Sequence, residues 1–336
     1  MRHKTMRPLA LLALVLAMML LTVASVGCGG DEAASTGGSP AAAPAADLTA
    51  EEIVAKGDAA MTDITSAAMT ADFSMAVEGD PAKMTDPSAA QLAQSPITLR
   101  VEGKESTDPV ALDMSMNVGL MGQTLDMGVL ADGDKAWVEY QGKYYEVDQK
   151  NTEGITQSAG SGLSPMDQLK QQGLDVDKWG LTYELLGVED VNGTQAYHIS
   201  AQMDPEEMVK DLLKQLKSGD LAGQLGDPAT AKQLEQALAE NQKQIDELAK
   251  SLSGIGGDYW YAVDTFYLVK ATMNATLDTK GQKDMQGVDS VAIEFAMTMS
   301  DFNEPVTVEP PAKSLPFDQL MDQMFGGMMG GSTFGT

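Results

Sequence analysis

Apolar and polar residues alternate with a period of two through much of this chain, beginning at Met69. The first run covers residues 69–77, and the same rule holds over 97–102, 112–118 and 125–129. Successive side chains of a β-strand point to opposite faces, so this pattern is typical of strands that bury one face only. The alternation therefore predicts a series of half-buried strands separated by short breaks.

Turn signals separate further strand-like runs. Asp132-Gly133 and Gln141-Gly142 flank runs near 136–140 and 144–147, and Asn192-Gly193 lies between 183–191 and 195–203. An Asn-Gly pair between two such runs is a strong hairpin signal. The last strands are expected at 258–264, 267–278 and 288–301. Hairpin connections of this kind predict an antiparallel, meandering sheet.

Helical spacing interrupts the strands in two places. Thr49 and Glu52 form a capping-box pattern that opens an amphipathic helix over 50–64, and residues 81–95 are expected to form a polar loop. Residues 204–253 read as a helical hairpin, since Asp-Pro pairs at 204–205 and 227–228 each begin an apolar stripe. The hairpin is either an ordinary packed insertion or a lid over a cavity.

The two ends of the chain differ from its middle in composition. Residues 1–27 combine basic residues, an apolar core from Leu9 to Val23 and small residues before Cys28, which is the pattern of a lipoprotein signal peptide with Cys28 as the lipidation site. Ordinary secretion with cleavage nearby is the alternative. Residues 28–47 are expected to be a flexible tether, 48–315 the folded domain, and 316–336 a Met/Gly-rich tail that lacks regular structure.

The net charge and the scarcity of cysteine and histidine exclude several classes of function. The 49 Asp+Glu against 22 Lys+Arg give a net charge of −27, which disfavours nucleic acid and any attraction to anionic headgroups. Cys28 is the only cysteine and there are two histidines, and no nucleotide-binding, serine-hydrolase or zinc-protease motif occurs. These absences argue against an enzyme, and we predict no catalytic residues, no metal and no cofactor.

Methionine is abundant on the predicted strand faces. Its flexible, polarizable side chain suits a surface that must fit apolar ligands of varied shape. The same residues could equally fill an ordinary core, and the tryptophans could line a cavity mouth or pack inside. The candidates for a ligand cavity are Met69, Phe73, Met75, Leu112, Met114, Met116, Met127, Trp137 and Trp260.

Two short motifs resemble known lipoproteins. Residues 258–264 (DYWYAVD) with 267–270 (YLVK) look like paired strands of LolA-like proteins, and 300–311 (SDFNEPVTVEPP) is similar to the ending of LppX/LprG-type lipid-binding lipoproteins. The resemblance implies an α+β fold in which a curled antiparallel sheet, a half-open barrel, wraps around helices and encloses an apolar cavity for acylated lipids. It implies no catalytic residues.

The sequence thus predicts a non-enzymatic protein attached to the extracytoplasmic face of the cell membrane through an N-terminal lipid anchor. It would bind a hydrophobic molecule or lipid and pass it on. The competing hypothesis is a structural or protein-interaction module with a filled core and no ligand, whose protein partner the sequence does not identify.

Overall fold

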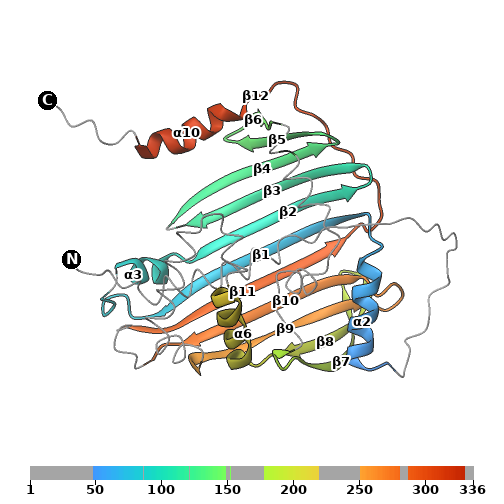
Figure 1. Cartoon of the computed structure of the whole chain (residues 1–336), viewed down its shortest axis with the longest axis vertical. Coiled ribbons are helices and arrows are strands. Elements are labelled where there is room, and N and C mark those ends of the chain that lie inside the picture. Colours follow the sequence, from blue (N-terminus) through green and yellow to red (C-terminus); the bar gives the residue numbers. More distant parts are fainter. Residues whose placement is uncertain are drawn as a thin grey trace.

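The computed structural model of the 336-residue chain describes residues 48–85, 87–120, 122–148, 152, 178–218, 250–280 and 287–329. Within these ranges, no helix is both long and apolar enough to cross a membrane. One large sheet dominates the molecule, with helices over part of one face and beside its ends (Figure 1).

The sheet has twelve strands in the spatial order β12-β6-β5-β4-β3-β2-β1-β11-β10-β9-β8-β7. Every pairing is antiparallel except that of β12 with β6. The strands are β1 (Ser66–Gly79), β2 (Ile97–Thr107), β3 (Val110–Leu120), β4 (Gln123–Asp132), β5 (Lys135–Tyr140), β6 (Lys143–Glu146), β7 (Thr182–Val191), β8 (Thr194–Gln202), β9 (Leu252–Ala262), β10 (Leu268–Asp278), β11 (Val288–Ser300) and β12 (Leu315–Pro316).

Two meanders build this sheet. Strands β1 to β6 lie next to one another in chain order on one side, and β7 to β11 do so on the other. Most connections are short, but the β1–β2 connection contains an α-helix, Pro87–Gln94, and the long β8–β9 connection contains another, Pro205–Ser218. The meanders join where β1 pairs with β11 over Ala68↔Ser300 to Gly79↔Val288. The sheet curls but does not close, because β7 and β12 remain at opposite edges. The α+β class and the curled, unclosed antiparallel sheet predicted from the sequence are confirmed.

The register assigns every strand residue to one of two faces. The face that carries Met69, Val101 and Met114 is here called the inner face, and the opposite one the outer face. The four described helices, α2 (Ala50–Met61), α3 (Pro87–Gln94), α6 (Pro205–Ser218) and α10 (Phe317–Met329), all pack their apolar side chains on inner-face residues. They cover separate parts of that face: α2 contacts β7 and β9, α3 contacts β1, α6 contacts β9, and α10 contacts β6 and β12.

Helix α2 begins at the predicted capping box. Thr49 accepts a hydrogen bond from the Glu52 backbone N–H, and the Glu52 carboxylate accepts one from the Thr49 N–H at 2.8 Å. The helix ends at Met61, three residues earlier than predicted, because Asp63 and Ile64 already lead into β1. Ile53 and Gly57 face the sheet and are buried. A β-carbon at Gly57 would overlap the ring of Tyr261, so the glycine permits close approach of helix and sheet.

Gly57→Ala should therefore destabilise the protein. Helix propensity alone would favour alanine by about 1 kcal/mol. The overlap with Tyr261 opposes this gain, and overpacking a core costs about 1–3 kcal/mol. We expect a net loss of about 1 kcal/mol in urea unfolding, and recovery when the same change is made in a Tyr261→Ala background. A stabilising Gly57→Ala in the otherwise unchanged protein would contradict this packing.

Three elements differ from the sequence prediction. The polar loop expected at 81–95 contains helix α3, which is held by burial of Ala89 against Val77 and Leu277. The tail expected to be unstructured forms α10, because Leu320 is buried beside Tyr145. The segment assigned to the helical hairpin ends in strand β9, which begins at Leu252. Of that hairpin, α6 is confirmed; residues 219–249 lie outside the described ranges.

Candidate functional site

The helices leave the middle of the inner face without helical cover from the described residues. We call this surface, on β2, β3 and β4, the central apolar face. Its side chains are neither fully buried nor exposed, whereas those under the helices are buried. Register places them side by side, since Val101 stands opposite Met116 and Met116 opposite Met127. The central apolar face consists of Leu99, Val101, Met114, Met116, Val118, Leu125 and Met127.

Seven of the nine cavity candidates lie on the inner face, as their alternation indicated. Met69 and Leu112 are buried in the core at 6% and 7% exposure, beside α2 and α10 respectively. The other five are half-buried and line or border the central apolar face: Phe73, Met75, Met114, Met116 and Met127.

The two tryptophans among the candidates lie on the outer face. Trp137 pairs with Leu130, while its neighbour Val138 pairs with the inner-face residue Val129. Trp260 pairs with His198, between the inner-face residues Tyr259 and Tyr261. Both indoles are buried, at 5% and 6% exposure, so they pack within the protein. Their placement in a cavity with the methionines was wrong, because each stands one residue out of phase.

One carboxyl group lies on the inner face among apolar residues. Glu105 stands between Ala67 on β1 and Leu112 on β3, and it is 4% exposed. It is the one charged side chain on the inner face of β1 to β5, all of whose residues are described. Burial raises the pKa of the Glu105 carboxyl from an ordinary 4.5 to about 8. The group is therefore mostly protonated, and neutral, at neutral pH.

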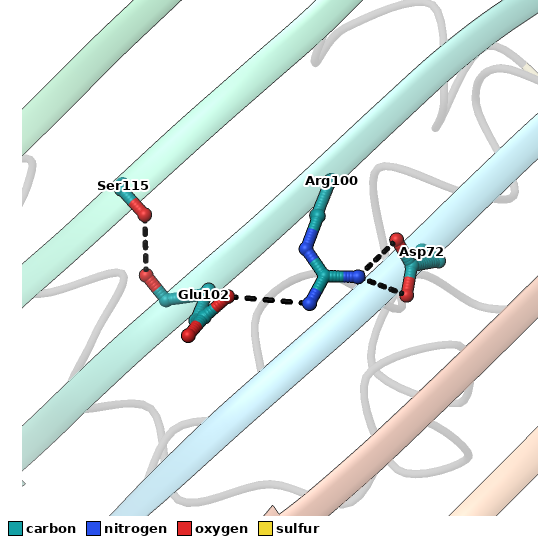
Figure 2. Close-up of polar contacts among 4 residues, drawn as sticks. All are labelled: Asp72, Arg100, Glu102 and Ser115. Atoms are coloured by element: carbon teal, nitrogen blue, oxygen red, sulfur yellow. Dashed lines mark hydrogen bonds and ion pairs between the residues drawn. The ribbon is translucent and has the colours of Figure 1, made fainter.

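A pocket of about 1000 Å³ opens over the same strands and is lined mainly from the outer face. Figure 2 shows polar contacts of its lining residues: Arg100 contacts Asp72 through Nη1 at 2.9 and 3.0 Å and Glu102 through Nη2 at 3.2 Å. The Ser115 hydroxyl donates a hydrogen bond to the Glu102 carbonyl. Thr307 and Glu309 border the pocket from the C-terminal segment.

The lining of this pocket does not suit acyl chains. It contains one cation, Arg100, which is engaged by two carboxylates, and five acidic residues: Glu102, Asp113, Asp126, Glu139 and Glu309. In the described part of the chain, no three His, Cys, Asp or Glu side chains gather as metal ligands would. An apolar ligand is therefore better matched by the inner face than by this pocket.

His198 belongs to a second polar cluster on the outer face. Its Nδ1 and Nε2 contact Glu189 at 2.9 Å and Asp258 at 3.1 Å, and its ring stacks on Trp260 at 4.3 Å. Lys270 lies over the same indole at 4.0 Å. Hydrogen bonds from the Trp260 indole and His198 hold the pKa of Glu189 below its ordinary value. Both imidazole nitrogens and the indole N–H are thus occupied within the protein, which indicates a structural role.

Sequence reasoning missed Glu105, although its signal was present. The alternation of Ile97, Leu99 and Val101, extended by four residues, assigns Glu105 to the apolar phase. The predicted lipidation site Cys28, the signal peptide and the tether lie outside the described residues.

No protein-family model matches this chain, and no curated protein matches it. Several solved structures are similar to it. The Mycobacterium tuberculosis lipoprotein LppX is 14% identical with a TM-score of 0.35, the match covering 76% of this chain and 96% of LppX. LprF from Mycobacterium bovis is 13% identical with a TM-score of 0.36, covering 79% and 97%.

A LolA superfamily protein from Nitrosomonas europaea is also similar, at 8% identity and a TM-score of 0.20, with 79% of this chain and 96% of that chain covered.

Proposed function

We propose that this protein is an exported lipoprotein that binds a hydrophobic ligand, an acylated lipid, against the central apolar face. The observation that carries the proposal is the position of that face on β2, β3 and β4, away from the strands that the four helices contact, except for α3 on neighbouring β1, together with its half-buried state. Contiguous apolar surface of this kind on a folded domain is typical of a binding site. The protein would act by binding and transfer rather than by catalysis.

The physical driving force is the removal of acyl surface from water. Each 100 Å² of apolar ligand surface buried contributes about 2.5 kcal/mol before the cost of ordering the ligand is subtracted. Met114 and Met116 lie on β3, and Met127 lies opposite Met116 on β4, so three unbranched side chains share this surface. They can adapt to acyl chains of different length and unsaturation. We expect broad selectivity among acyl chains.

The proposal includes attachment to the extracytoplasmic face of the cell membrane through acylated Cys28. Two or more acyl chains on one residue suffice for stable attachment without a basic surface. The net charge of −27 fits this arrangement, because it offers no electrostatic attraction to anionic headgroups. Residues 28–47 would tether the domain close to the membrane from which it takes its ligand.

The test is lipid uptake by the delipidated domain. The chain from Leu48 onward, stripped of lipid by organic extraction and refolded, is mixed with vesicles of phosphatidylcholine that contain a fluorescent diacyl lipid. We expect uptake that saturates near one equivalent per chain. Refolded protein that takes up no lipid would instead indicate a filled core and an interaction module.

A further inference from the structure

Glu105 is the feature of the inner face that an apolar surface alone does not explain. The carboxyl lies in the row Ala67, Glu105, Leu112, and no cross-strand neighbour offers it a polar side chain. Among the described residues, neither a hydrogen bond nor an ion pair to its side chain is present, while its exposure is 4%. No completely enclosed side-chain oxygen or nitrogen within the described ranges lacks a hydrogen bond, so the Glu105 oxygens keep a narrow contact with solvent rather than a protein partner.

A carboxyl with so little solvent contact has lost most of its hydration. A buried donor or acceptor that finds no partner costs about 1–3 kcal/mol, so buried carboxyls are normally paired. If such a carboxyl lies on a surface that binds a ligand, a hydrogen-bonding group of the ligand can become its partner. In the neutral form that burial favours, Glu105 has one O–H to donate.

Resting on the proposed function, we propose that Glu105 is the polar anchoring point of the ligand, and that its protonated carboxyl donates a hydrogen bond to an ester carbonyl oxygen of the bound lipid. A neutral donor in apolar surroundings requires a neutral acceptor, since a charged headgroup would have to be desolvated there. The ester carbonyl of a neutral acyl glycerol meets this requirement and is joined directly to the chains that the central apolar face would hold.

Glu105 also fixes where the ester would lie. It is two rows from Met116 along the inner face, with Gly103 and Met114 forming the row between. Met114 fills the space beside Gly103, because a β-carbon there would lie 2.7 and 2.9 Å from the Cα and Cγ atoms of Met114. Acyl chains would therefore run from Glu105 over the flexible Met114 side chain toward Met116 and Met127. The ligand would thus have its polar end at Glu105 and its chains across β2, β3 and β4.

The test compares two probes that differ only in their carbonyl groups: dioleoylglycerol and the matching dioleyl diether of glycerol. The full chain, kept soluble by an amphipathic polymer, is equilibrated with phosphatidylcholine vesicles containing both probes, and the vesicles are removed by centrifugation. Mass spectrometry of the extracted protein then gives the ester-to-ether ratio. Polymer without protein gives the background.

We expect the unchanged protein to favour the diester by about tenfold, the effect of one hydrogen bond formed away from water. Glu105→Leu should abolish this preference while both probes still bind, and Glu105→Gln, which retains a donor, should keep part of it. Glu102→Leu, an exposed residue of the same strand on the outer face, should leave the ratio unchanged.

The outcomes separate the two proposals. A Glu105→Leu protein with the original ester-to-ether ratio, or an unchanged protein that binds both probes equally, would overturn the anchoring role and leave lipid binding intact. Failure of the unchanged protein to take up either probe would overturn the proposed function itself. Leucine removes an unpaired polar group from an apolar site, so loss of the ratio would not arise from unfolding.

Discussion

Glu105→Gln should raise the free energy of unfolding by about 3 kcal/mol at neutral pH. The pKa of Glu105 is about 8 in the folded protein against 4.5 ordinarily, and burial is the cause. Between these two values the folded chain holds a proton that the unfolded chain has released, so stability falls as pH rises through this interval and levels off above about 8. Glutamine is neutral throughout and does not incur this loss.

Urea unfolding of both proteins as a function of pH checks this expectation. The difference should be small below pH 4.5, grow with pH, and become constant above about 8. Glu102→Gln is the matched control, because Glu102 is exposed on the same strand and its ion pair with Arg100 is worth less than about 1 kcal/mol. A difference between the Glu105 proteins that does not vary with pH would show that this carboxyl is ionised in the folded state.

Met116→Glu should reduce lipid uptake at least tenfold. Met116 lies at the middle of the central apolar face, opposite Val101 and Met127, where a carboxylate would have to be desolvated against an acyl chain. The residue is half-buried, which limits the damage to the fold. Uptake is measured with the fluorescent diacyl lipid and phosphatidylcholine vesicles.

Ser115→Glu is its matched control. Ser115 is the preceding residue of the same strand, is exposed, and points to the outer face, so the variant carries the same added charge on the opposite side. We expect uptake close to that of the unchanged protein. Equal losses in the two variants would indicate a general effect of charge, and retention of uptake by Met116→Glu would place the ligand elsewhere.

The strands could be predicted from the sequence because alternation and turn residues are local signals. The run 69–77 and the Asn192-Gly193 turn correspond to β1 and to the β7–β8 hairpin. The joining of the two meanders through β1 and β11 could not be predicted, since it pairs residues more than 200 positions apart and no turn encodes it. The same holds for α3 and α10, which depend on tertiary contacts of Ala89 and Leu320 rather than on strong helical patterns.

Residues of the candidate site were placed correctly where they were assigned from the alternation of apolar and polar residues along a strand. Met114 and Met116 alternate with exposed polar residues, and their shared face follows directly. Trp137 and Trp260 were assigned by residue type, and both belong to strands with large residues on either face. Glu105 is the opposite case. Its position in the alternation of β2 places it on the apolar face, although a glutamate is normally expected to face solvent.

The central claim is that this protein holds a lipid, and native mass spectrometry tests it most directly. The chain from Leu48 onward is exported without its anchor, purified without detergent, and weighed before and after organic extraction. The account predicts that most molecules carry the extra mass of one acylated lipid, which extraction removes and fragmentation identifies. A bare polypeptide mass, both as purified and after incubation with membrane lipids, would contradict it.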